Sequence, residues 1–301
     1  MAENTKDIWV EVALNGPWGK ARQPMMPIAV EHIVKEAIEA AAAGAGIVHF
    51  HAYDEQTGVQ KDDWQIYARI IEGIRAKADV IAYPTVPLAG SALTGEAKTA
   101  EERSRHIDEL GRRGLIEWAV VDPGSVNFTR YDSDRSGEAA FVYLNPEDHV
   151  REGMRVCVKH GIRPSFAIYE PGFARLGANL ASKFPGLKRP VYRWMLSDEY
   201  AWGLPPKSYA LDAYLALLSE VSPGSPWMIA GLGVDIEPLV PEALARGGHI
   251  RIGLEDAHLH DVRSNAQILE RALRLLTKNG ASSASPASIR ASLAAGDQAP
   301  A

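Results

Sequence analysis

The sequence lacks several features that would assign it to a common class. It contains a single cysteine, Cys157, among 301 residues, so an intrachain disulfide and a cysteine-based zinc site are both excluded. Any metal ion would have to be held by His, Asp or Glu. Basic residues are not in excess either, because 32 Lys and Arg stand against 38 Asp and Glu, for a net charge of −6. This balance argues against a general nucleic-acid binder or a binder of anionic membranes.

Long apolar runs are also missing. The most apolar stretch, 40–50, is interrupted by glycine and is too short to cross a bilayer. The first ten residues lack the basic and then apolar pattern of a secretory signal. We therefore expect a cytoplasmic protein without a membrane segment. The hydrophobic content of 46% is typical of a folded globular chain.

Short apolar runs alternate with longer amphipathic runs along most of the chain. The pattern predicts eight strands, at 8–15, 47–52, 80–86, 116–122, 164–169, 191–197, 227–232 and 250–254. It predicts helices at 30–43, 64–77, 99–113, 146–160, 209–220, 239–245 and 262–277. Strands that alternate with helices pair in parallel, and no glycine-rich nucleotide motif of an open doubly wound sheet follows the first strand. We therefore predict an α/β fold, a (β/α)8 TIM barrel over 1–281, with a C-terminal helix and tail over 282–301.

The sharpest chemical signal is His49-Phe50-His51, at the end of the second predicted strand. Residues two apart on a strand point to the same side, so both imidazoles face one way. Two neutral ring nitrogens in this arrangement suit a divalent metal ion. A hydrogen-bonded pair of core histidines would show the same pattern, so a third ligand is needed to separate the two interpretations.

Glu255, at the end of the eighth strand, supplies that ligand. Strand 8 closes a barrel against strand 1, so strands 8 and 2 lie roughly 9–10 Å apart with only strand 1 between them. Gly16, at the end of strand 1, leaves room above it for the side chains to converge. Two histidines and one glutamate form a zinc site with an open fourth position, although Mn, Co or Fe would also suit this set.

Arg251 and Asp256 flank this glutamate in the sequence. Alternation along the strand places Arg251 on the same inward face as Glu255, and a buried arginine must be paired, with Glu11 and Asp256 as available partners. The arginine is then either purely structural or functional, in which case it holds a substrate carboxylate or orients Asp256, while Asp256 either acts as a base or orients a histidine. Asp122 is expected to cap a loop. Further residues that we expect to bind substrate or support the ligands are Asn15, Thr85, Ser125 and Glu170.

Several short motifs occur in a fixed order from about residue 8 to residue 277. Asn-Gly follows strand 1, Val-His-x-His ends strand 2, Tyr-Glu-x-Gly follows strand 5, Ala-Gly-x-Gly follows strand 7, and Gly-His-Ile-Arg-x-Gly-x-Glu-Asp covers strand 8. Gly-Ser-Val-Asn-Phe and Ser-Asn-Ala-Gln lie at 124–128 and 264–267. Together these motifs resemble the β-keto acid cleavage enzymes, and the strand-2 and strand-8 motifs are the most specific.

The resemblance implies a zinc-dependent TIM barrel that converts a β-keto acid and acetyl-CoA into acetoacetate and a new acyl-CoA. It makes His49, His51 and Glu255 the zinc ligands, Asp256 the general base and Arg251 the partner of that base. It also implies a homo-oligomer, either a tetramer or a dimer. No nucleophilic cysteine is required in this chemistry, which suits a chain whose one cysteine is expected in mid-helix.

The sequence departs from the family's type member, 3-keto-5-aminohexanoate cleavage enzyme, at three positions. Trp18 stands nearest to a glutamate that handles the substrate's amino group, Pro84 replaces a serine that supports the base, and Val120 replaces a threonine. These exchanges make the pocket less polar and remove an anion that could pair with an ammonium group. We therefore predict a β-keto acid with a neutral or apolar tail.

Other classes of protein also use a metal-binding barrel. A hydrolase of the amidohydrolase type would carry its two histidines on strand 1 and further lysine or histidine ligands on strands 4 to 6, and those strands contain neither. A metal-dependent aldolase or lyase would share the enolate chemistry without CoA. A metal-binding protein without activity would share the ligands alone. Dependence of turnover on acetyl-CoA separates these alternatives.

Overall fold

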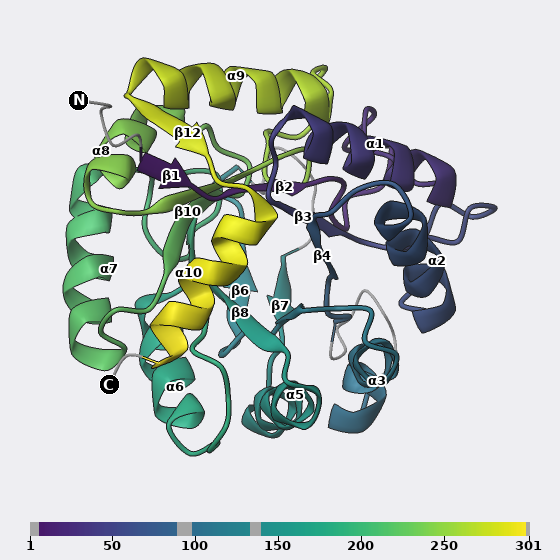
Figure 1. The fold of residues 1–301 in the computed structure, drawn as a ribbon, viewed down its shortest axis with the longest axis horizontal. Helices are drawn as coiled ribbons and strands as arrows, with labels where there is room; N and C mark the ends of the chain where they lie inside the picture. Colours follow the sequence, from purple (N-terminus) through teal and green to yellow (C-terminus); the bar gives the residue numbers. More distant parts are fainter. Residues whose placement is uncertain (1–5, 89–97, 133–139, 299–301) are drawn as a thin grey trace.

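The computed structural model describes residues 6–88, 98–132 and 140–298. Within them, eight parallel strands form one sheet in the order β4-β3-β2-β11-β10-β9-β8-β5. The sheet curls into a nearly closed barrel in which the edge strands β4 and β5 contact each other, and the larger helices surround it (Figure 1). The predicted (β/α)8 architecture is therefore confirmed.

The element boundaries follow the sequence pattern closely. The barrel strands are β2 (Val10–Ala13), β3 (Ile47–Phe50), β4 (Ile81–Pro84), β5 (Trp118–Val120), β8 (Arg163–Ile168), β9 (Val191–Leu196), β10 (Trp227–Gly231) and β11 (His249–Ile252). The helices are α1 (Val30–Ala43), α2 (Trp64–Arg75), α3 (Ala100–Arg112), α5 (Glu147–His160), α6 (Pro171–Ala181), α7 (Ser208–Val221), η1 (Glu237–Leu239), α8 (Val240–Ala245), α9 (Asn265–Lys278) and α10 (Pro286–Gln298). In the described part of the chain, none of these helices combines the length and the apolar character that a membrane span requires.

Local capping chemistry sets several helix ends. Thr99 accepts the backbone N–H of Glu102, whose side chain accepts the backbone N–H of Thr99 in return, which forms a capping box at the start of α3. Gly44 ends α1 in the left-handed conformation. Helix α6 was not predicted individually. It begins at Pro171, within the Tyr-Glu-x-Gly motif at 169–172.

The expected strand at 8–15 is divided in the structure. β1 (Lys6–Ile8) leaves the barrel and pairs with β12 (Ala281–Ser283), while β2 enters the barrel. The break falls at Trp9, whose backbone N–H donates to Nδ1 of His249 at 3.1 Å and whose ring stacks on that imidazole. At Trp9 the imidazole of His249 takes the place of a backbone acceptor from a neighbouring strand. The segment 8–15 is therefore divided between two sheets. A second small sheet pairs β6 (Val126–Phe128) with β7 (Phe141–Tyr143).

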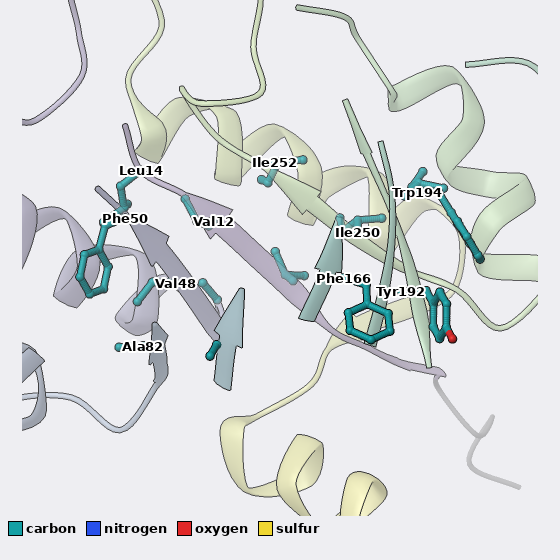
Figure 2. Packing of buried hydrophobic residues seen from close by; sticks show 14 of the residues in the cluster. Val12, Leu14, Val48, Phe50, Ala82, Phe166, Tyr192, Trp194, Ile250 and Ile252 are labelled. Atoms are coloured by element: carbon teal, nitrogen blue, oxygen red, sulfur yellow. The ribbon is translucent and has the colours of Figure 1, made fainter. Parts of the chain in front are cut away.

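Alternation along the strands divides the barrel into an apolar outside and a charged inside. Val12, Ile250, Tyr192 and Trp194 belong to the large core cluster between strands and helices, part of which Figure 2 shows. Glu11, Arg193 and Arg251 belong to the same strands and are almost completely buried. The interior of the barrel therefore carries the charged groups that the sequence pattern places between apolar neighbours.

Helix α10 covers the N-terminal ends of the strands. Ala284, Ile289 and Leu293 pack in one cluster with Trp9, Ile47, Ile81 and Trp118 from the base of the barrel. In Figure 1 this helix crosses in front of the strands. The segment 282–301, which the sequence analysis set apart as a C-terminal helix and tail, thus contributes to the base, and its last residues, 299–301, lie outside the described residues.

Candidate metal centre and active-site cavity

His49, His51 and Glu255 converge at the C-terminal ends of the strands. β2 lies between β3 and β11, as expected for a closed barrel. Nε2 of His49 lies 3.4 Å from Oε2 of Glu255, and Nε2 of His51 lies 3.4 Å from Oε1. Zinc bonds of about 2.0–2.1 Å at tetrahedral angles separate ligand atoms by roughly 3.3 Å. One ion can therefore reach all three side chains.

The environment of His51 leaves one ring nitrogen available to a metal. Nδ1 of His51 lies 3.0 Å from Oε1 of Gln60, and the amide nitrogen of Gln60 donates to Asp62 at 3.0 Å. Because Gln60 therefore presents its oxygen to the ring, the proton of His51 sits on Nδ1. Nε2 is buried and has no hydrogen-bond partner among the described residues, and the same holds for Oε2 of Glu255. Both atoms are free to act as metal ligands.

A turn after β11 brings Glu255 to the histidines. The strand ends at Ile252, and Gly253 follows with φ of +133°, where a Cβ would lie 2.2 Å from the carbonyl oxygen of Ala13. The backbone N–H of Glu255 donates to that same carbonyl at 3.2 Å. Arg251 and Glu255 therefore meet through this turn, and the expectation that strand alternation aligns them is wrong.

Gly16 touches the side chain of Glu255. Its φ is +72°, and a Cβ at this position would lie 2.6 Å from Cγ of Glu255. Nε1 of Trp18 donates to the carbonyl of Glu255 at 2.8 Å, so the loop after β2 holds this residue from a second side. The room that the absence of a side chain at Gly16 was expected to leave is occupied by the side chain of Glu255.

Replacing Gly16 with alanine should weaken metal binding about 10- to 100-fold, because the added methyl group displaces Glu255. The left-handed backbone adds roughly 1–2 kcal/mol of destabilisation. Gly19→Ala is the matched control, since Gly19 has φ of +70° but no atom within 4 Å of the added Cβ. Competition with a chelator would measure metal affinity in both variants. Equal losses in the two variants would show that backbone strain, rather than contact with Glu255, is responsible.

Arg251 is surrounded by three carboxylates. Its Nε and Nη2 donate to the two oxygens of Asp256 at 2.9 Å each, and Nη1 donates to Glu11 at 3.0 Å. Nη2 also lies 2.9 Å from Oε1 of Glu255. The predicted pairing of Arg251 with Glu11 and Asp256 is therefore confirmed. Asp256 lines a separate cavity under α9 and is not among the described residues that line the cavity at the metal ligands.

Burial and neighbouring charges set the protonation states of these groups. Burial lowers the pKa of His49 well below its usual value, so its ring is neutral. Burial acts to raise the pKa of Glu255, but Arg251 and the two histidines outweigh it and hold the pKa well below the usual range. Burial raises the pKa of Asp256 to about 6, against the opposing effect of Arg251. Neutral imidazole and ionised carboxylate are the forms that bind a metal cation.

The buried charges around this centre are not balanced. The guanidinium groups of two arginines face the carboxylates of four acids, which leaves a formal excess of two negative charges; these residues are Arg193, Arg251, Glu11, Asp122, Glu255 and Asp256. Uncompensated charge is costly in a protein interior. A divalent cation at the three ligands would remove the excess, so both the charge and the geometry of the centre fit a divalent metal ion.

The candidate metal ligands line a cavity with about 680 Å³ of empty space, a figure that includes solvent at its mouth. Polar groups and the ligands form part of its wall. Aromatic rings form another part, supplied by Trp18, Phe128, Phe141, Tyr143 and Tyr169. Phe128 contacts the rings of Phe141, Tyr143 and Tyr169 at centroid distances of 4.9 to 5.9 Å. The cavity therefore combines a charged centre with an apolar surface.

Of the remaining predicted residues, one lines the cavity and three lie elsewhere among the described residues. Thr85 lines the cavity. Asn15 instead fixes the backbone of His51, accepting its N–H at 2.8 Å and donating to its carbonyl at 3.0 Å. Ser125 is exposed and accepts a backbone N–H, and Glu170 is the N-cap residue of α6. In the part of the chain that the structure describes, Asn15, Ser125 and Glu170 do not line the cavity.

Two charged residues of the cavity wall were not predicted there. Asp122, expected to cap a loop, accepts hydrogen bonds from the hydroxyl of Tyr143 at 2.6 Å and the N–H of Ala167 at 3.0 Å. Arg193 lies inside the barrel on β9. A signal for Arg193 was present, since a lone arginine in the apolar run Val-Tyr-Arg-Trp-Met-Leu invites the argument that was applied to Arg251. The sequence around Gln60 contains no comparable pattern that would predict its contact with His51.

Comparison with known proteins decides the family. A family-wide sequence profile of the beta-keto acid cleavage enzymes matches residues 7–294. The chain belongs to this family. The two motifs that carried the resemblance, Val-His-x-His and Arg-x-Gly-x-Glu-Asp, supply the three candidate metal ligands of this beta-keto acid cleavage enzyme.

Curated relatives of this beta-keto acid cleavage enzyme match it over most of their length. It is 26% identical over 307 residues to 3-dehydrocarnitine:acetyl-CoA trimethylamine transferase of Rhizobium meliloti, with 96% of each chain covered. It is 28% identical over 273 residues to 3-keto-5-aminohexanoate cleavage enzyme of Fusobacterium nucleatum, with 89% of this chain and 90% of that one covered. The solved complex of ObcA with oxaloacetate shares the fold, with a TM-score of 0.70 at 18% identity over 91% of this chain and 68% of that chain.

Proposed function

We propose that this enzyme uses a divalent ion, zinc, at His49, His51 and Glu255 to convert a β-keto acid and acetyl-CoA into acetoacetate and a new acyl-CoA. The observation that carries the proposal is the set of two imidazoles and a carboxylate at 3.4 Å spacing, in which Nε2 of His51 and Oε2 of Glu255 are buried without a hydrogen-bond partner among the described residues. Acetyl-CoA as second substrate is supported by the name of the Rhizobium meliloti relative.

A metal ion at these ligands would draw electrons from the carboxylate and ketone oxygens of the keto acid and so acidify the C2 proton between them. Two imidazoles and one carboxylate leave a coordination position open for the substrate, as in other catalytic zinc sites. Because the same set suits Mn, Co and Fe, metal analysis of the purified protein tests the choice of zinc.

The proposed reaction proceeds through two carbon-centred steps. Asp256 takes the C2 proton on a carboxylate oxygen, and C2 attacks the thioester carbonyl of acetyl-CoA, from which CoA leaves as thiolate. The thiolate then attacks the C3 carbonyl, the C2–C3 bond breaks, and Asp256 returns its proton to C2. Acetoacetate and the new acyl-CoA are released, and no protein nucleophile takes part.

Arg251 positions the proposed base. It holds both oxygens of Asp256 at 2.9 Å and also contacts the metal ligand Glu255. As a base, Asp256 would accept the proton on an oxygen that Arg251 now binds. The guanidinium therefore connects the proposed base to the metal centre, and it stabilises the ionised form of the carboxylate before the first proton transfer and after the second.

We propose that the substrate has a neutral or apolar tail. The aromatic part of the wall buries apolar groups favourably. Both oxygens of Asp122 already accept hydrogen bonds, and Nη2 of Arg193 lies 3.6 Å from Oδ1, so the charge of this acid is already partly compensated. An aromatic wall also suits a quaternary ammonium group, and the name of the Rhizobium meliloti relative includes trimethylamine.

A panel of β-keto acids that share acetyl-CoA as second substrate tests the tail. We expect kcat/KM for 3-oxohexanoate to exceed that for 3-keto-5-aminohexanoate about tenfold or more, because burying an unpaired ammonium group is costly. Release of acetoacetate is the measurement, and 3-dehydrocarnitine serves as the quaternary ammonium comparison. A preference for the amino substrate would contradict the proposal. Cleavage without acetyl-CoA would favour the aldolase or lyase alternative.

We also propose, from the family resemblance, that the enzyme is a cytoplasmic homo-oligomer, either a dimer or a tetramer. Light scattering of the purified protein measures its mass directly. A monomer at micromolar concentration would contradict this part of the proposal without affecting the chemistry at the metal centre.

A further inference from the structure

Arg193 is a buried arginine of the cavity that the mechanism above does not use. Its strand neighbours Tyr192 and Trp194 pack in the core between the barrel and the helices, so the arginine points into the barrel (Figure 2). It is 3% exposed and lines the same cavity as the metal ligands. In the barrel order, three strands separate β9 from β3 in either direction. Arg193 therefore faces His49 and His51 across the barrel.

The guanidinium of Arg193 has few partners. Nη2 lies 3.4 Å from the carbonyl of Ser165 and 3.6 Å from Oδ1 of Asp122. Nε is buried without an acceptor among the described residues. Arg251, on the same inner surface, makes four contacts of 2.9 to 3.0 Å with carboxylates. The N–H donors of Arg251 are thus paired with carboxylates, whereas Arg193 retains donors without a close acceptor.

Asp122 cannot complete the coordination of Arg193. Its Oδ1 accepts the N–H of Ala167 at 3.0 Å, and its Oδ2 accepts the hydroxyl of Tyr143 at 2.6 Å. These bonds hold the carboxylate in place, and the separation of 3.6 Å from Nη2 is longer than a hydrogen bond. A guanidinium carries five N–H donors, and leaving them without acceptors in a buried site is unfavourable. Such a group is ready to bind an added anion.

We propose that Arg193 binds the carboxylate of the β-keto acid, on the oxygen that faces away from the metal ligands; this inference rests on the proposed function. With a divalent ion at the centre, the buried charges are balanced, and the substrate then brings one further negative charge. Guanidinium groups recognise carboxylates through short charge-assisted hydrogen bonds. Arg193 and the candidate metal ligands line the same cavity from opposite sides, and the proposal places the carboxylate between them. Arg193 thereby fixes the orientation of C2 between them.

The test compares two ligands that differ in this charge and by one methyl group. Acetoacetate is a β-keto acid, and methyl acetoacetate is its neutral ester. Binding of each to the metal-loaded enzyme, without acetyl-CoA, is measured by calorimetry for the wild type, Arg193→Gln and Arg193→Lys. Arg163→Gln is the matched control, since Arg163 is a buried arginine of neighbouring β8 that pairs with Asp297 at 2.6 Å and does not line the cavity within the described residues.

We expect Arg193→Gln to weaken acetoacetate binding about 10- to 100-fold, the loss of a hydrogen bond to a charged group, and to leave methyl acetoacetate binding unchanged. Arg193→Lys should recover part of the loss, and Arg163→Gln should bind both ligands as the wild type does. An equal loss for both ligands in Arg193→Gln would overturn the proposal, because it would indicate a structural role. Unchanged acetoacetate binding would overturn it as well. Since acetyl-CoA is absent, failure of acyl transfer in the wild type is detected separately, in the substrate panel.

Discussion

Glu255→Gln is expected to lose its bound metal and to lower turnover by about 100-fold or more, since loss of even an outer contact to a metal ligand costs 10- to 100-fold. Glutamine keeps the size of the side chain but removes the charge that a divalent cation needs beside two neutral imidazoles. It also removes one of the three carboxylates around Arg251. Metal content by mass spectrometry and acetoacetate release with acetyl-CoA are the two measurements.

Glu270→Gln is the control for this change. Glu270 is an exposed residue of α9 that pairs with Arg274 and is not among the described residues that line the cavity at the candidate metal ligands. We expect this variant to keep its full metal content and activity. If Glu255→Gln retained one metal ion per chain with unchanged affinity, the assignment of the centre to His49, His51 and Glu255 would have to be abandoned.

Asp256→Asn should lower kcat roughly 10²- to 10⁴-fold, the range of a general base, while metal content stays at the wild-type level. Asparagine fits the same space but cannot accept the C2 proton. Exchange of the C2 protons of the keto acid with deuterated water, followed by NMR in the absence of acetyl-CoA, isolates this step. We expect the exchange to be lost together with turnover.

Glu11→Gln is the matched variant for Asp256→Asn. Glu11 is also a buried partner of Arg251, at 3.0 Å, but it belongs to β2 and has no proposed part in proton transfer. We expect a smaller loss of kcat and a normal rate of C2 exchange in this variant. Equal losses in the two variants would mean that the placement of Arg251, rather than a base at Asp256, limits the reaction.

The architecture followed from the sequence because the barrel is built from local signals. Apolar runs of strand length alternate with amphipathic segments, and Thr99 and Gly44 mark helix ends by capping chemistry that depends on a few neighbouring residues. The division of the run at 8–15 could not be predicted in this way. It depends on the stacking of Trp9 on His249, which are 240 residues apart in the chain.

The convergence of the candidate metal ligands could also be anticipated, since the order of parallel strands in a closed barrel places β2 between β3 and β11. The residues that hold these ligands in place could not be anticipated. Gln60 belongs to a loop whose path is set by tertiary contacts, and the turn at Gly253 replaces the alternation that was expected to align Arg251 with Glu255. Arg193 was missed for a different reason, because its role depends on which acceptors surround it, and only the structure shows that they are too few.

The pairing of β1 with β12 and the packing of α10 have a consequence for the synthesis of the protein. Within the described residues, Lys6–Ile8 pairs with Ala281–Ser283, and the apolar base of the barrel is covered by Ala284, Ile289 and Leu293. While the chain emerges from the ribosome, this base therefore stays open to solvent until α10 has been translated. Contacts of such long sequence separation also slow folding. We therefore expect the base of the barrel, at the end opposite to the candidate metal ligands, to be the last part to pack during folding.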